Sequence, residues 1–362
     1  MEFTRLAGIG VVTGELDRAA EHYARLLDVG EWTVDDFSDD RLSDMVSHGR
    51  RTSGTFRTAF GETPFDPDRP GPMGAEARSI PFELVQPTGG ETPFNEFLLS
   101  IGEGIAFLTL ETAASDATIE QHFGDLNIPR ASSMTIDGST ARTFWDTRAR
   151  LGGYLLEVVN QPRPATGTVR IIDGASSRNG HRALPVTGIN HFGVIVDDLM
   201  TSLEDYRAIL GIQKFDVKTW QAEHGRLDAP YYRDHNPVAH GYFTAQGFAG
   251  DFGFEVIQVK YGPSHYNREF TDQRGPGIHH VFPYLTFDSS DWDQSVEAMT
   301  ALGAPLCMGS DLRAGAAEYG YFDTFDTLGG FLIEGVIRRS TAEPKYMAPD
   351  WTVDFTTKIT EA

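Results

Sequence analysis

The sequence repeats itself, and this repeat limits the folds that the chain can adopt. The segments 144–157 and 321–334 share seven identical positions, all at a constant separation of 177 residues, and the last shared residue is a glutamate. A second pair of segments, 82–87 and 254–259, reads F-E-L-V-Q-P and F-E-V-I-Q-V. Because internal repeats mark repeated structural units, the two halves of the chain are predicted to share one fold.

Each half also contains a smaller repeat of a strand, a helix and several further strands. Apolar residues recur at helical spacing in 16–27 and in 199–210, directly after short apolar strands that include Gly10 and Gly193. Strand-like segments near Ile105 and Ile278 are followed by further apolar stripes of helical spacing. The chain is therefore predicted to contain four such units.

The predicted division of the chain follows from these repeats and from composition. Residues 1–162 form the first domain, and residues 184–340 form the second. The segment 163–183 between them is rich in Pro, Gly, Ser and Thr, which is typical of a linker. Residues 341–362 form a polar C-terminal tail that is expected to pack on the body of the protein or on a partner subunit.

Charge and cysteine content exclude several classes of function. The chain has 30 basic and 52 acidic residues, a net charge of −22, so nucleic acids and anionic membranes are poor partners. Cys307 is the single cysteine, which excludes an internal disulfide and a thiolate metal cluster. The sequence contains no apolar run of membrane-spanning length and no signal-peptide pattern at its start, so a cytoplasmic location is expected.

Two histidines in the second half are placed to face a common site. Side chains alternate between the faces of a strand, so His191 lies on the face opposite Phe192 and Val194 in the segment 189–196. In the segment 278–285, His280 lies opposite His279 in the same way. A single histidine in a strand is usually structural, but these two occupy the same place in two repeated units.

Each of these histidines is followed by a glutamate in an apolar strand, Glu255 or Glu334. A carboxylate in an apolar strand is costly unless it is paired, hydrogen-bonded or bound to a metal. Two imidazoles and one or two carboxylates are good ligands for a divalent ion. The sequence therefore predicts one divalent metal ion (Fe, Co, Mn, Ni or Zn) bound by His191, His280, Glu334 and Glu255.

The first half provides an internal comparison for this prediction. Gly8 and Phe107 occupy the places of the two histidines, whereas Glu83 and Glu157 are retained. The first half is therefore predicted to bind no metal and to act as a scaffold, a lid or a dimer surface. The comparison also weakens Glu255 as a ligand, because a glutamate persists at the equivalent place without histidines.

These motifs resemble those of the vicinal oxygen chelate superfamily. The segment 329–335, G-G-F-L-I-E-G, is similar to the G-G-V-L-I-E-L of methylmalonyl-CoA epimerases, and 275–281, G-P-G-I-H-H-V, is similar to their G-E-G-I-H-H-I. The resemblance implies an α+β fold of four βαβββ modules, with a cupped mixed β-sheet in each half and helices outside. A resemblance to the epimerases implies four metal ligands, namely His191, Glu255, His280 and Glu334. A resemblance to the extradiol and hydroxyphenylpyruvate dioxygenases, which also have four modules, implies only His191, His280 and Glu334.

Three functions remain open from the sequence. The first is a metal-dependent isomerase, epimerase or lyase acting on a small oxygenated molecule through a metal-stabilised enolate. In that reaction Glu255 is the candidate base, and Tyr321 a candidate proton-relay residue together with Tyr319 and Asp323. The second is an Fe(II) ring-cleaving dioxygenase in which a loop histidine, His240 or His265, acts as acid or base.

The third function is a ligand-binding resistance protein without catalysis. The presence of both histidines and of Glu334 argues against this function. In each case the expected partner is a small molecule, and a homodimer is compatible with the modules. The segment 220–237 makes the third unit longer than the fourth, and it is either a lid over the site or a surface insertion.

Overall fold

The computed structural model describes residues 1–69, 71, 76–161, 166–222, 225–312, 315–339 and 348–356. The chain forms two compact units. Unit 1 comprises the described residues of Met1–Ala149, Gly153–Gly188 and Thr324–Phe331. Unit 2 comprises those of Arg150–Gly152, Ile189–Asp323 and Leu332–Ala362.

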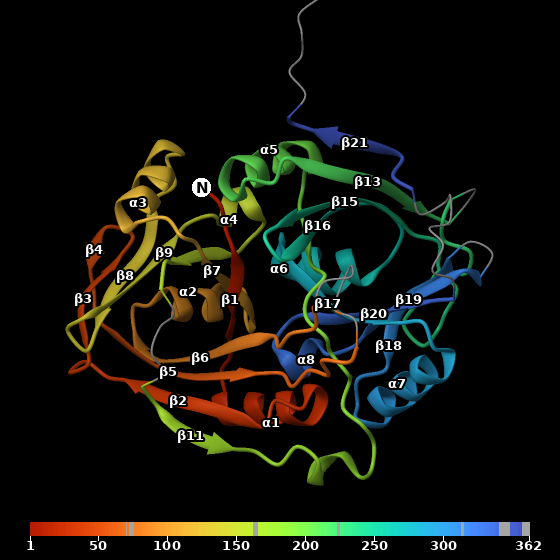
Figure 1. Ribbon diagram of the computed structural model, residues 1–362, viewed down its shortest axis with the longest axis horizontal. Helices are drawn as coiled ribbons and strands as arrows, with labels where there is room; N and C mark the ends of the chain where they lie inside the picture. Colours follow the sequence, from red (N-terminus) through yellow and green to blue (C-terminus); the bar gives the residue numbers. More distant parts are fainter. Residues whose placement is uncertain are drawn as a thin grey trace, which may run out of the picture. The chain divides into compact units, whose positions relative to one another are not determined.

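Unit 1 contains a curled mixed sheet of eleven strands in the order β11-β2-β5-β6-β1-β7-β10-β9-β8-β3-β4 (Figure 1). Its strands are β1 (Arg5–Val12), β2 (Glu31–Phe37), β3 (Leu42–Ser47), β4 (Arg50–Arg51), β5 (Gly54–Glu62), β6 (Pro81–Gly90), β7 (Gly104–Glu111), β8 (Arg130–Ile136), β9 (Thr140–Trp145), β10 (Leu155–Val159) and β11 (Thr168–Ile171). The helices in this part of the chain are α1 (Leu16–Leu27), α2 (Pro93–Ser100), α3 (Asp116–Asp125) and α4 (Arg148–Leu151).

Unit 2 contains a curled mixed sheet of ten strands in the order β14-β18-β19-β20-β17-β12-β16-β15-β13-β21. Its strands are β12 (His191–Ile195), β13 (Lys214–Gln221), β14 (Tyr231–Tyr232), β15 (Gly241–Ala249), β16 (Phe252–Tyr261), β17 (Gly277–Thr286), β18 (Leu306–Leu312), β19 (Ala317–Phe322), β20 (Leu332–Arg338) and β21 (Trp351–Asp354). The helices are α5 (Leu199–Leu210), the π-helix η3 (Tyr266–Thr271), α6 (Asp272–Arg274) and α7 (Ser289–Ala301), and the short α8 (Phe325–Leu328) belongs to unit 1.

The two sheets have the same register at their centres. In unit 1, Gly10 of β1 pairs with Glu83 of β6 and with Phe107 of β7. In unit 2, Gly193 of β12 pairs with Glu255 of β16 and with His280 of β17. The prediction of four βαβββ modules in two homologous halves is confirmed.

The helices predicted at 16–27 and 199–210 form because one face of each is apolar. In α5, the residues Leu199, Leu203, Tyr206 and Leu210 are buried against the sheet. Asp198 caps its first turn by accepting a hydrogen bond from the backbone of Thr201. The helix ends at Gly211, whose φ of 75° places it in the left-handed region that glycine adopts without strain.

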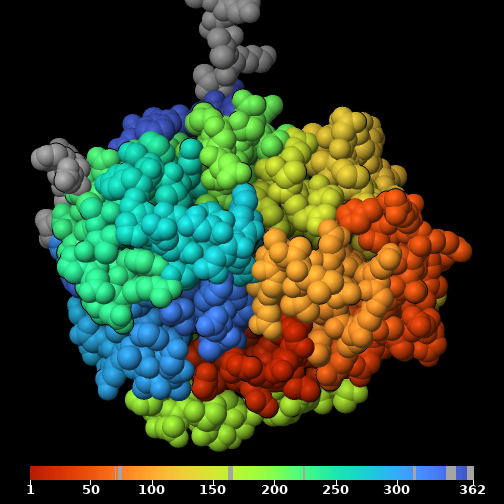
Figure 2. Space-filling model, turned by 180° about the vertical axis from the view of Figure 1, so that it is seen from behind, coloured from red at the N-terminus to blue at the C-terminus, as the bar shows by residue number. Residues whose placement is uncertain are grey.

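One helix in each unit lies on the inner face of its sheet, in addition to the helices outside. In unit 1 this helix is α2 (Figure 1). Its Phe94 contacts the rings of Phe56, Phe107 and Phe144, so apolar side chains fill the cup. Thr92 caps α2 and a proline opens it. The opposite side of α2 reaches the surface of the unit, where it forms part of the orange area in Figure 2.

In unit 2 the equivalent segment is the π-helix η3. Asn95 and Asn267 are 172 positions apart, as are Glu83 and Glu255, and each asparagine donates a hydrogen bond to a glycine carbonyl five residues before it. By the same separation, Phe94 of α2 corresponds to Tyr266 of η3. The inner helix is therefore part of the repeat, but in unit 2 it brings polar rings into the cup.

The remaining segments extend the two sheets at their edges. Strand β11, within the segment predicted as a linker, pairs with β2. Strand β21, within the predicted C-terminal tail, pairs with β13. In the segment 220–237, β14 pairs with β18. Among the helices of the described ranges, none has the length and apolar character needed to cross a lipid bilayer.

Candidate metal centre

Four side chains of unit 2 converge at the inner face of its sheet: His191, Glu255, His280 and Glu334, from β12, β16, β17 and β20. Each offers a ligand atom, and these four atoms all lie within 4.8 Å of one another. Alternation along adjacent central strands places them together, because each of the four points to the inner face.

The distances within this cluster match those around a bound divalent cation. Oε2 of Glu334 lies 3.2 Å from Nε2 of His191 and 3.5 Å from Nε2 of His280. Oε2 of Glu255 lies 3.6 Å and 3.7 Å from the same two nitrogens. With metal–ligand bonds of ~2.1 Å, neighbouring ligands lie ~3.0 Å apart in an octahedron and ~3.4 Å apart in a tetrahedron. All four residues are therefore within the reach of one ion.

Unsatisfied polar atoms provide an independent test of the fit. Nε2 of His191, Nε2 of His280 and Oε2 of Glu334 are buried, and none of the three has a hydrogen-bond partner among the described residues. Buried polar atoms without partners are rare in proteins because each costs free energy. Three such atoms that face one another, two from neutral imidazoles and one from a carboxylate, form a donor set that suits a divalent metal.

The protonation preferences of the cluster agree with this fit. Burial raises the pKa of Glu334 to about 8. Burial also raises the pKa of Glu255 to about 7, and the charge of Glu334 adds to this effect although His191 opposes it. Burial lowers the pKa of both histidines, so their rings are neutral and can ligate a metal. Without a cation, the two carboxylates therefore cannot both ionise at low cost.

Neighbouring side chains hold the rings of the two histidines. Nδ1 of His191 lies 2.7 Å from Oδ1 of Asn190, which also accepts a hydrogen bond from Gln246. Nδ1 of His280 lies 3.0 Å from Nδ1 of His279. In both histidines Nδ1 is engaged, which leaves Nε2 directed at the two carboxylates.

Four buried tyrosines surround the cluster. The hydroxyl of Tyr321 lies 2.6 Å from that of Tyr266, and Tyr242 donates a hydrogen bond to Tyr319 over 3.0 Å. The ring of Tyr321 lies 4.8 Å from that of His280. Burial and the charge of Glu334 raise the pKa of Tyr321 well above its ordinary value. Tyr321 is therefore a hydrogen-bonding side chain beside the cluster and stays protonated at neutral pH.

The two histidines proposed from the sequence as an acid or base, His240 and His265, are both buried. His235, in the same part of the chain, is exposed. Asp323 does not continue the face of Tyr319 and Tyr321, because β19 ends at Phe322. Its carboxylate instead lies within 4.8 Å of ligand atoms of His265 and Cys307.

Solved structures with the same arrangement of modules exist. A mutant of 4-hydroxymandelate synthase from Streptomyces coelicolor matches with a TM-score of 0.56 and 13% identity, over 96% of this chain and 95% of that chain. A xylose isomerase-like TIM barrel/4-hydroxyphenylpyruvate dioxygenase fusion protein matches with a TM-score of 0.50 and 11% identity, over 94% of this chain and 50% of that one. The chain has the vicinal oxygen chelate fold. No protein-family model matches the sequence, and neither does any curated protein.

Within this vicinal oxygen chelate fold, unit 1 holds an arginine where unit 2 has its candidate metal ligands. Arg142 of β9 donates hydrogen bonds to both oxygens of Glu83, at 2.7 and 3.1 Å, and to both oxygens of Glu157, each at 2.9 Å. Its side chain is only 1% exposed. Burial alone would lower the pKa of Arg142, but the two carboxylates outweigh burial and raise it.

Reasoning from the sequence missed Arg142, which stands in the segment T-A-R-T-F-W. The signal was present, because two glutamates in central strands without histidines require some other cation. Gly8 and Phe107 occupy the histidine places as expected, and the structure explains why Glu83 and Glu157 persist there. A retained glutamate in unit 1 is thus paired with a guanidinium, and its presence no longer argues against Glu255 as a ligand.

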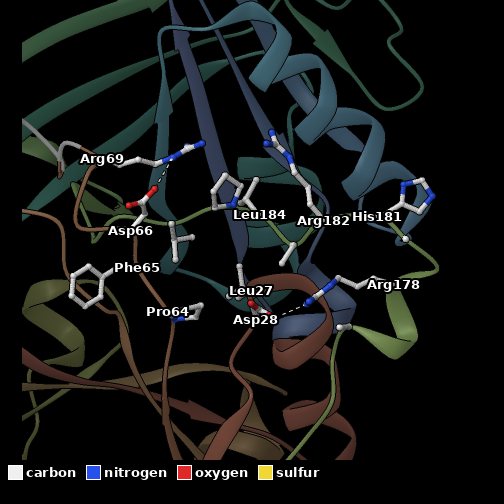
Figure 3. Close-up of a pocket in the computed structure, with 15 residues that line it drawn as sticks. Leu27, Asp28, Pro64, Phe65, Asp66, Arg69, Arg178, His181, Arg182 and Leu184 are labelled. Carbon is white, nitrogen blue, oxygen red and sulfur yellow. Dashed lines mark hydrogen bonds and ion pairs between the residues drawn. The ribbon is translucent and has the colours of Figure 1, made fainter.

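Unit 1 also has a cavity of about 630 Å³, whose lining shares no residue with the apolar cluster in the cup (Figure 3). Arginines and acids line it in pairs: Arg178 lies 2.7 Å from Asp28, and Arg69 lies 3.9 Å from Asp66. The four candidate metal ligands belong to unit 2 and do not line it. This cavity is therefore separate from the candidate metal centre.

Proposed function

We propose that this protein is a metal-dependent enzyme that binds a small substrate through two neighbouring oxygen atoms. His191, His280 and Glu334 would hold one divalent cation, and Glu255 would either complete the ligand set or act beside it. The observation that carries the proposal is the convergence of three buried polar atoms, on His191, His280 and Glu334, which have no hydrogen-bond partner in the described part of the chain. When bound, such a cation would supply Lewis acidity, and iron would in addition supply reactivity with molecular oxygen.

The chain itself supplies the orientation and the surroundings of the reaction. The carboxylates of Glu255 and Glu334 keep 14% and 10% of their side-chain area exposed, so a small molecule can reach them, whereas His280 is fully buried. Tyr321 and Tyr266 fix each other through their hydroxyls. As a protonated group beside the cluster, Tyr321 can donate a hydrogen bond to an oxygen of the substrate but cannot serve as a base at neutral pH.

An oxygen-dependent reaction is our first candidate. It is supported by the likeness over nearly the whole chain to proteins named 4-hydroxymandelate synthase and 4-hydroxyphenylpyruvate dioxygenase. A set of two histidines and one carboxylate suits non-haem iron and leaves positions for substrate and oxygen. In this reaction Glu255 would lie beside the cation without ligating it, and its carboxylate would accept hydrogen bonds from the substrate.

An isomerase or epimerase is the second candidate, and the position of Glu255 favours it. Its Oε2 is close enough to both histidines to ligate the same ion, and burial raises its pKa to about 7, near the value that suits a general base at neutral pH. If Glu255 is a fourth protein ligand, it leaves fewer positions on the ion for molecular oxygen. If Glu255 is instead a base next to the bound substrate, it suits the removal and return of a proton. The two candidates thus assign Glu255 different roles.

Metal analysis of the purified protein with its variants tests the proposal. The expected result is about one divalent ion per chain in the wild type, lost in His191→Ala and in His280→Ala. The exposed His235→Ala serves as the matched control and should retain the ion. A wild type that takes up no divalent ion even after loading would overturn the proposal.

The reaction class is decided by two assays on the loaded protein. Iron in the protein, with oxygen uptake in the presence of 4-hydroxyphenylpyruvate or of catechols, would support the oxygenase. Cobalt, manganese, nickel or zinc, with deuterium exchange next to a substrate carbonyl and no oxygen uptake, would support the isomerase. Glu255→Gln should abolish the exchange reaction but only reduce oxygen uptake.

A further inference from the structure

A chain of three buried histidines leads away from the candidate metal centre. Nδ1 of His280 lies 3.0 Å from Nδ1 of His279, and Nε2 of His279 lies 2.9 Å from Nδ1 of His265. The first two side chains are fully buried, and His265 is 3% exposed. We call His280, His279 and His265 the histidine chain.

The contacts determine which nitrogen of each ring carries the proton. If Nε2 of His280 ligates a cation, its proton is on Nδ1, and Nδ1 of His279 must accept it. The proton of His279 is then on Nε2, where it is donated to Nδ1 of His265. The proton of His265 is in turn on Nε2. One binding event at His280 therefore fixes the tautomers of three rings.

The surroundings of the three histidines favour hydrogen bonds that are donated from His280 to His279 and from His279 to His265. Rings of Tyr266, Phe270 and Tyr321 lie within 6 Å of that of His279, so its two histidine neighbours are its natural hydrogen-bond partners. At the outer end, the partly exposed carboxylate of Asp323 lies within 4.8 Å of His265. A negative charge there stabilises a ring whose proton points outwards.

A comparison of the two repeated units shows that the histidine chain and the candidate metal ligands occur together. The positions of His279 and His280 are occupied in unit 1 by Ala106 and Phe107, and that of His265 by Pro93. The first unit thus lacks all three histidines, and its paired glutamates bind Arg142 instead. The histidine chain occurs only in the unit that has the candidate metal ligands.

We propose that His279 and His265 are positioning residues, which hold the ring of His280 with Nε2 toward the cation and thereby raise the affinity of the site. This inference rests on the proposed function, because it requires that His280 binds a metal. Loss of a hydrogen-bond partner behind a ligating histidine typically weakens metal binding by about 10- to 100-fold.

The test compares two variants of His265, the last residue of the histidine chain, with a control variant at another buried histidine. His265→Leu removes the acceptor for His279, whereas His265→Asn retains an oxygen near the place of Nδ1. His240→Leu is the matched control, because His240 is also buried in unit 2 but stacks on Tyr242. Zinc affinity is measured by competition with a chromophoric chelator, and circular dichroism verifies folding.

The expected result is that His265→Leu binds zinc about 10- to 100-fold more weakly than the wild type. His265→Asn and His240→Leu should remain within about threefold of the wild type, since each keeps the hydrogen bond to His279. In zinc-loaded wild type, ¹⁵N NMR of the imidazoles should show the proton of His280 on Nδ1 and that of His279 on Nε2. A merely structural role for His265 would not predict these tautomers.

Three outcomes would overturn the inference while leaving the proposed function intact. These are unchanged zinc affinity in His265→Leu, an equal loss in His265→Asn, or a proton on Nδ1 of His279 in the zinc-loaded wild type. A wild type that binds no zinc, cobalt or iron would instead overturn the proposed function, and the inference with it.

Discussion

Gly193 lies directly beneath the imidazole of His280 at the centre of unit 2. A β-carbon on residue 193 would lie 1.9 Å from Cε1 and 2.1 Å from Nε2 of that ring, distances that no pair of non-bonded atoms tolerates. The two residues are paired in neighbouring strands, so neither backbone can move away without breaking the sheet. The absent side chain of Gly193 thus provides the space in which the candidate ligand sits.

We therefore expect Gly193→Ala to weaken metal binding by at least about tenfold, as other changes that reorient a ligating histidine do. The matched control is Gly10→Ala, whose β-carbon would lie 2.2 Å from the ring of Phe107 in unit 1. That change should destabilise its unit by about 1–3 kcal/mol through overpacking but leave metal binding unchanged. Zinc titration and urea unfolding of both variants check this, and normal zinc affinity in Gly193→Ala would contradict it.

Removal of Arg142 should destabilise unit 1 strongly. Arg142→Met leaves Glu83 and Glu157 buried without a cation, and breaking a buried ion pair in this way costs about 3–5 kcal/mol. Replacing both glutamates by glutamine in the same variant should restore most of the lost stability. The measurement is the urea unfolding midpoint, and a loss below about 1 kcal/mol in Arg142→Met would show that the triad is not needed.

Glu334 and Glu255 should contribute unequally to cation affinity. Oε2 of Glu334 is closer than that of Glu255 to both histidine nitrogens, and no described residue forms a hydrogen bond with it. We expect Glu334→Gln to weaken binding by at least about 100-fold, and Glu255→Gln to weaken it less, within the range of about 10- to 100-fold. Equal losses in calorimetric titrations would mean that both carboxylates ligate the ion in the same way.

The stability of the metal-free protein should fall as the pH rises from about 6.5 to about 8. Burial raises the pKa of Glu255 to about 7 and that of Glu334 to about 8, from an ordinary value of 4.5. Between pH 4.5 and about pH 8 these two carboxyl groups therefore retain protons in the folded form that the unfolded chain releases, so their contribution to stability decreases across this window. Five buried histidines of unit 2 have lowered pKa values and outweigh this effect below about pH 6.5, so the net fall is expected above that pH: His191, His240, His265, His279 and His280.

Thermal unfolding between about pH 6.5 and about pH 8 measures this effect, because the buried histidines no longer oppose it there. Glu334→Gln should show a flatter dependence, which separates the carboxylate from the histidines. Saturating zinc should remove the fall at the alkaline end, because the ion binds the deprotonated form. A midpoint that rises from about pH 6.5 to about pH 8 in the metal-free wild type would refute the expected protonation of these carboxylates.

The repeat and the strand alternation were sufficient to predict the modules and to bring four residues together. Both are local patterns: His191 and His280 occupy equal places in their units, and alternation fixes the face of each side chain. The inner helices were not predicted. Thr92 and Pro93 do signal the start of α2, but no local pattern states that a helix lies on the inner face of a sheet.

Contacts between distant segments were also beyond the sequence. His265 and His279 are 14 positions apart and meet because the π-helix η3 folds back over β17. The strand pattern does not reveal the partners of Arg142, because Glu83 and Glu157 lie on β6 and β10, which β1 and β7 separate in the sheet. Hydrophobic spacing predicts which face a residue takes, whereas charge pairing depends on the order and the curl of the strands in the folded sheet.

The guanidinium between Glu83 and Glu157 is covalently part of the chain, and this has a consequence for a cell that is short of metal. Unit 1 always has its counterion, so its folding does not depend on ion supply. Unit 2 has the equivalent pair of carboxylates, Glu255 and Glu334, without an arginine of the described ranges between them. An ion that binds only the folded form of unit 2 would stabilise that form in proportion to the logarithm of the ion concentration. Under starvation for divalent ions, unit 2 should therefore be the half that proteases attack first, and the amount of intact protein would report on metal supply.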